Sequence, residues 1–253
     1  MSKIKLLNCI ITGVLVIGLV QNAHAHTRLN VPTMTEGTRI INEMIIGDNC
    51  AVESSQRIIG TSVVFPDGLD STILANGQPH EGPLTDFLTN YGNNIQLIFS
   101  RAAFEFMDEK TDSSGNVTGF WAGGGPGSPG HLTVATPFRL TAASIEPTSC
   151  ATSVKIQISI ADICQITSAE QFAGGAADGV AKLWTHNNLG TQYDRDSEAD
   201  DGPAPFTITR DLTNNPLPDS CEDGFVVEVM PSAAQINRDM PITIEGKQVW
   251  PSN

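Results

Sequence analysis

His26 occupies the position with the most distinctive potential chemistry, because cleavage after Ala25 would make it the first residue of the mature chain. The free α-amine and the ring Nδ1 of one histidine can then close a chelate on a single metal ion. The α-amine has a pKa of about 8 and the imidazole of about 6.5, so a metal can displace both protons near neutral pH. Two nitrogen donors in a planar arrangement favour Cu(II) among the common divalent ions. His26 is therefore a candidate Cu(II) ligand.

The start of the chain has the composition and order of an export signal. Lys3 and Lys5 supply positive charge, residues 6–20 form an apolar stretch, and the tripeptide AHA at 23–25 matches the small-x-small cleavage pattern. The apolar stretch is short for a membrane span, and no later segment approaches the roughly 20 apolar residues that cross a bilayer. We therefore expect residues 1–25 to be a signal peptide, and the mature chain to be periplasmic or secreted with no membrane span.

The charge balance restricts the partners of the mature chain. Lys3 and Lys5 are the basic residues of the signal, so its removal leaves 12 of the 14 Lys and Arg residues against 28 Asp and Glu residues, a formal charge of −16. Such a surface repels the phosphates of nucleic acid and anionic membrane surfaces. We expect no nucleic-acid partner.

Cysteine use is typical of an exported chain. Cys9 lies in the signal, and four cysteines remain, which suggests two disulfides with three possible pairings. No CxxC pattern or Cys/His cluster occurs, so a thiolate metal site has little support. The remaining cysteines are Cys50, Cys150, Cys164 and Cys221.

Short β-strand patterns dominate the rest of the chain. VKIQISI at 154–160 alternates apolar and polar residues with the period of a half-buried strand. Strands are expected at 38–46, 58–65, 95–106, 131–140, 153–162, 179–186, 205–210, 224–230 and 242–249. Helical periodicity is weak, with short helices expected at 83–91 and 168–173. The glycine-rich 122–130 (AGGGPGSPG) lacks the Lys-Ser/Thr of a phosphate-binding loop and is expected to be a flexible turn.

Many short strands between turns predict an all-β protein, an immunoglobulin-like β-sandwich with long Gly/Pro/Asn-rich loops. After the signal at 1–25, we expect a β-sandwich over 26–210. Residues 211–253 are expected to form a C-terminal β extension packed on the same domain.

Several motifs, in this order, resemble the YcnI-type periplasmic copper-binding family. They are HTRLNVPTMTEGTRIINEMIIGDNC at 26–50, SVVFPDGL at 62–69, VTGFWAGGG at 117–125, ICQ at 163–165 and DGVAKLW at 178–184. The resemblance covers roughly 26–210 with gaps. It implies a non-enzymatic protein that stores, buffers or transfers Cu(II), with another periplasmic or membrane copper-handling protein as a possible partner.

The resemblance also implies a ligand set, namely the N-terminal histidine, a strand carboxylate and a tryptophan. By position these correspond to His26 and Trp184, with Trp121 as the second choice. The carboxylate has no counterpart, because Thr133 stands near its place. We hypothesise that His131, two residues earlier on the same strand face, supplies a further nitrogen.

His186 is a reserve ligand, and Glu36 is a nearby carboxylate for which a turn is the preferred explanation. His186 follows Trp184 at strand spacing, and Glu36 is the carboxylate closest in sequence to His26, although Gly37 beside it indicates a turn. The resemblance favours the disulfides Cys50–Cys164 and Cys150–Cys221, because Cys50 and Cys164 correspond to the two family cysteines.

Two alternatives to copper storage or transfer remain open. A copper enzyme of the lytic polysaccharide monooxygenase type also begins with a copper-binding histidine, but Tyr91 and Tyr193 are the only tyrosines and no aromatic substrate surface is evident. A disulfide-bonded β-sandwich without metal could instead serve as a scaffold or adhesion module. Copper titration separates this last alternative from the other two.

Overall fold

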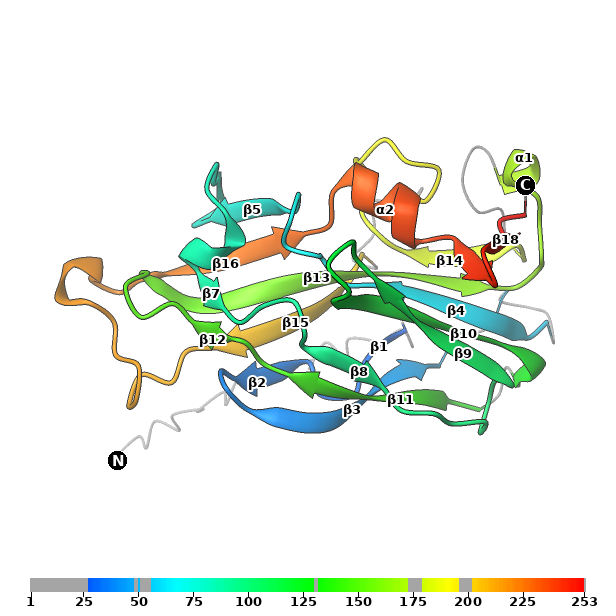
Figure 1. Cartoon of the computed structure of the whole chain (residues 1–253), viewed down its shortest axis with the longest axis horizontal. Coiled ribbons are helices and arrows are strands. Elements are labelled where there is room, and N and C mark those ends of the chain that lie inside the picture. Colours follow the sequence, from blue (N-terminus) through cyan, green and yellow to red (C-terminus); the bar gives the residue numbers. More distant parts are fainter. Residues whose placement is uncertain are drawn as a thin grey trace, which may run out of the picture.

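The computed structural model describes residues 27–47, 50, 56–129, 132–172, 179–195 and 202–252. Two β-sheets lie face to face, with the smaller sheet below the larger one in Figure 1. The smaller sheet has the order β1 (Arg28–Leu29), β3 (Arg39–Ile46), β11 (Val134–Thr141), β8 (Ile95–Leu97). The all-β sandwich prediction is confirmed.

The larger sheet is built around its longest strand, β13 (Ala151–Ile163). The sheet order is β6 (Gln78–Pro79), β5 (Thr72–Ala75), β16 (Phe225–Met230), β13, β4 (Ile58–Val64), β10 (Val117–Ser128), β9 (Phe106–Thr111). Off this path, β14 (Ala181–Trp184) and β15 (Ala204–Thr209) pair with β13, and β2 (Thr33–Thr35) pairs with β15. The remaining elements are η1 (Leu84–Asp86), β7 (Leu88–Thr89), β12 (Ser144–Ile145), α1 (Ala169–Phe172), η2 (Asp219–Cys221), α2 (Ala233–Asp239), β17 (Ile242–Ile244) and β18 (Lys247–Trp250). Among the described residues, none of the helices is long and apolar enough to cross a membrane.

Strand alternation places side chains of the larger sheet on two buried faces. On β13, Ile158 and Ile160 lie in the core between the sheets, whereas Ala161 and Ile163 belong to a second apolar cluster on the opposite face. Full burial of each such isoleucine contributes about 1.5–3 kcal/mol. α2, β17 and β18 cover part of this outer face (Figure 1), so the central strands are apolar on both sides.

Both disulfides link β13 to distant segments. Cys50 pairs with Cys164 just after the end of β13, and Cys150 just before its start pairs with Cys221. These are the pairs that the family resemblance favours. The two ends of the longest strand are therefore covalently tied to the rest of the fold.

Four expected segments differ in the structure. Instead of one strand over 95–106, β8 ends at Leu97, because the N–H groups of Leu97 and Ser100 bind the side chains of Glu109 and Met107. The expected turn at 122–130 is largely part of β10. Gly124, Gly125 and Gly127 adopt positive φ, and the register shifts between Gly123 and Ser128, so an irregular strand continues through the glycine-rich run.

The expected strand at 242–249 is a hairpin of β17 and β18. Glu245 and Gly246 both have positive φ, the conformation of a tight hairpin turn. The expected helix at 83–91 reduces to η1 followed by β7, and the helix expected at 168–173 is α1. α2 has no counterpart among the expected elements.

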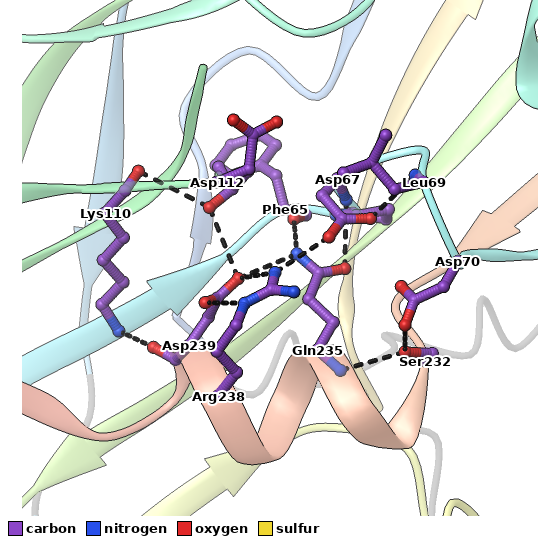
Figure 2. Close-up of polar contacts among 12 residues, drawn as sticks. Phe65, Asp67, Leu69, Asp70, Lys110, Asp112, Ser232, Gln235, Arg238 and Asp239 are labelled. Atoms are coloured by element: carbon purple, nitrogen blue, oxygen red, sulfur yellow. Dashed lines mark hydrogen bonds and ion pairs between the residues drawn. The ribbon is translucent and has the colours of Figure 1, made fainter. Parts of the chain in front are cut away.

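Polar contacts anchor α2 to the larger sheet, as Figure 2 shows. Ser232 caps the helix by accepting a hydrogen bond from Gln235 N at 3.0 Å. The Gln235 side chain donates to Phe65 O at 2.8 Å and accepts from Asp67 N at 3.0 Å. Arg238 donates to the buried Asp67 carboxylate at 2.8 Å. These contacts fix the helix directly beyond the end of β4.

Lys110 holds the other end of α2 (Figure 2). Its Nζ donates to the main-chain oxygen of Asp239, and to Ser62 Oγ at 2.5 Å. A lysine at this place satisfies carbonyl groups at the C-terminal end of the helix. Burial lowers the pKa of Lys110 to about 7, although the negative charge of Asp239 acts in the opposite direction.

This lowered pKa predicts a pH-dependent stability. In the unfolded chain Lys110 keeps its proton up to its ordinary pKa of 10.5. In the folded chain Lys110 loses this proton above a pH of about 7. Between these values the unfolded state binds more protons, so this residue makes the free energy of unfolding rise with pH. Lys110→Met should remove that rise in urea unfolding measured from pH 6.5 to 9.5. The exposed Lys247→Met is the control, and equal slopes in both variants would contradict the assignment.

Candidate metal-binding site

A buried carboxylate lies near the C-terminal end of β13, close to the start of the described chain. Asp162 is 0% exposed, and its position is in phase with the core residues Ile158 and Ile160. Trp184 Nε1 donates to Asp162 Oδ2 at 2.8 Å. Thr27 Oγ1 donates to the same oxygen at 2.5 Å. The structure thus joins the first described residue, a carboxylate and the candidate tryptophan.

Strand pairing explains how Trp184 reaches this carboxylate. β14 runs antiparallel to β13, with Trp184 opposite Ile160 and Lys182 opposite Asp162. Trp184 therefore faces the interior of the sandwich, as Ile160 does, and its ring packs in the main core. The indole N–H, which can only donate, orients the carboxylate. Both contacts to Asp162 Oδ2 stabilise a negative charge that is costly to bury without hydrogen bonds.

The other candidate ligands are placed as follows. His26 and His131 lie outside the described residues, so their roles remain predictions. Trp121, the second-choice tryptophan, belongs to the outer apolar cluster on the opposite face of the larger sheet from Trp184. Of the two candidate tryptophans, Trp184 is the one that contacts Asp162, which also accepts a hydrogen bond from Thr27.

Glu36 has a structural role at a different place. Its carboxylate accepts hydrogen bonds from Ile145 N at 2.6 Å and Asp211 N at 2.8 Å. It also accepts from the Asn215 side chain at 3.1 Å. These bonds tie the turn at Gly37 to the segment after β15, in agreement with the expectation of a turn.

His186 lies in a charged environment distinct from the Asp162 contacts. Burial lowers its pKa below the usual value, and Arg195 and Lys155 act in the same direction, whereas Glu228 and Asp194 raise it. Its Nε2 has no hydrogen-bond partner among the described residues. Within that same part of the chain, no group of three His, Cys, Asp or Glu side chains is arranged to hold a metal ion. Metal binding at Asp162 would therefore require ligands from outside it.

Comparisons with known proteins place few constraints on function. No protein-family profile and no curated protein matches the chain. Among solved structures, it is similar to an uncharacterised protein from Nocardia farcinica described as having an immunoglobulin-like fold. The two share 12% identity over 74% of this chain and 99% of the other, with a TM-score of 0.34. A similarity this weak adds nothing to the fold derived from the strand order.

Asp162 is the site residue that sequence reasoning missed. The signal was present, because Asp162 continues the inward-facing series Val154, Ile156, Ile158 and Ile160 at the period of two. An acidic residue at an inward strand position is unusual and points to a polar contact in the core. The family pattern has its carboxylate on the strand after the glycine-rich run, where this sequence has Thr133.

Proposed function

We propose that this is an exported Cu(II)-binding protein that stores, buffers or transfers the ion outside the cytoplasm, and that it is not an enzyme. The contact of Thr27 and Trp184 with one buried carboxylate carries the proposal. Consecutive Cα atoms are about 3.8 Å apart, so a mature chain that begins at His26 would start beside Asp162.

The proposed donor set combines two nitrogens and one oxygen. His26 would contribute its α-amine and ring Nδ1, and Asp162 would supply the strand carboxylate for which the sequence has no obvious candidate. Imidazole and amine nitrogens with a carboxylate oxygen suit Cu(II). Trp184 would act indirectly, because its N–H holds the carboxylate in place and its ring excludes water.

A Cu(II) titration with electron paramagnetic resonance tests the carboxylate. The mature protein beginning at His26 should bind one tight equivalent with nitrogen hyperfine structure. Asp162→Asn keeps an acceptor for Thr27 and Trp184 but removes the charge. It should weaken binding at least about 10–100-fold, because that is the cost of losing a residue that only orients a ligand, and it should change the spectrum.

The matched control is Asp108→Asn, which removes the same charge from an exposed position on β9. It should leave affinity and spectrum unchanged. If Asp162→Asn behaves like this control, the carboxylate is not a ligand. If the unmodified mature protein binds no copper tightly, the disulfide-bonded scaffold becomes the better explanation.

A further inference from the structure

The outer face of the larger sheet contains a gap in its side-chain cover. Strand register aligns Phe106, Gly123, Gly60 and Ile163 across β9, β10, β4 and β13. Neighbouring strands are about 4.8 Å apart, so the two glycines leave a bare backbone floor two strands wide between Phe106 and Ile163.

A side chain at either glycine would occupy this gap. A Cβ on Gly60 would lie 3.1 Å from Ala122 O, and one on Gly123 would lie 3.4 Å from the Cα of Gly60. Neither glycine has the positive φ that would by itself require glycine. Glycine is instead suited to these positions because the backbones of the two strands approach closely. The absence of side chains there also leaves the backbone uncovered, which distinguishes these positions from ordinary turn glycines.

Apolar side chains wall this floor into a groove of about 280 Å³. Its lining includes Trp121 of β10, and the β17–β18 hairpin supplies Ile244 and Trp250. No charged side chain lines the groove among the described residues. At its rim, Phe106 is 53%, Ile166 64% and Ile244 40% exposed, so these side chains are left partly in water.

We propose that this groove binds the single alkyl chain of a small amphiphile with an uncharged or cationic headgroup. A volume at the lower end of ligand sites fits one narrow chain. The branched aliphatic walls and the absence of charge favour a hydrocarbon. The formal charge of −14 on the whole chain opposes an anionic headgroup at the mouth of the groove. This inference does not depend on copper binding.

The test is a fluorescence titration of the full mature protein with N-phenyl-1-naphthylamine, an uncharged apolar probe, followed by displacement with 1-decanol. We expect saturable one-site binding that decanol reverses and that decanoate reverses at least several-fold less well. Gly123→Val should fill the floor and weaken binding at least tenfold. Phe106→Ser, which removes an exposed rim side chain, should weaken it several-fold and serves if the valine variant does not fold.

Ile41→Ser is the control, because Ile41 is also exposed and apolar but lies on β3 of the smaller sheet. It should leave probe binding unchanged. Equal affinities in the control and in both groove variants would overturn the proposal, as would absence of saturable binding. Concentration-dependent dimers that only the groove variants abolish would also overturn it, since the occupant would then be a second copy of the chain.

Discussion

Cu(II) affinity should fall by about 10²–10⁴-fold when one glycine is placed before His26. The extension moves the free α-amine to another residue and leaves the imidazole as a single donor. Two donors joined on one residue bind more tightly than separate ones by about this factor, since the second donor acts at high effective concentration. The measurement is a Cu(II) titration of both proteins, with nitrogen hyperfine structure in electron paramagnetic resonance as the second readout.

The control carries the additional glycine after Asn253, at the other end of the chain, and should bind as the unmodified protein does. Equally weak binding with and without the N-terminal glycine would sink the copper proposal. His131→Ala in the same titration decides whether a third nitrogen takes part. An unchanged affinity and spectrum would exclude His131 and leave Asp162 as the additional ligand.

Arg210→Met should lower the free energy of unfolding by about 3–5 kcal/mol, the range for a buried charged group that loses its partners or leaves them unpaired. Arg210 is 6% exposed. Its guanidinium donates to Pro147 O at 2.8 Å, and to Ser149 O and Ala151 O at 3.0 Å. It also donates to Asn215 O at 2.7 Å, which joins the segment before β13 to the segment after β15.

Urea unfolding with both disulfides intact measures this effect. Arg210→Lys should lose nearly as much stability, because an ammonium lacks the planar set of donors that reaches these carbonyls. Arg101→Met, at an exposed position, should change stability by less than about 1 kcal/mol. A lysine variant as stable as the wild type would show that charge, and not the geometry of the guanidinium, matters at this position.

Strand positions could be predicted where the pattern of side chains depends on local chain geometry alone. β13 and β3 were recognisable because successive side chains of a strand point to opposite faces. The strands whose ends differ from the sequence-based prediction are those whose ends depend on residues distant in the sequence. β8 ends at Leu97, where the side chain of Glu109 accepts a hydrogen bond from the Leu97 N–H, and β10 continues to Ser128 because Ser128 pairs with Ile58 of β4 beyond the register shift.

The candidate site divides in the same way. Residue type and position alone single out His26, since an N-terminal histidine has two adjacent nitrogen donors, whereas Trp184 is a candidate through the family resemblance of its motif. The sequence alone also determined an all-β fold and an excess of negative charge, because alternation and composition are local properties. Only the tertiary structure decided that Asp162, 135 residues from Thr27, meets it and Trp184. That contact arises from the pairing of β13 with β14 and the arrival of the N-terminal segment at the same end of the sandwich, which no local pattern encodes.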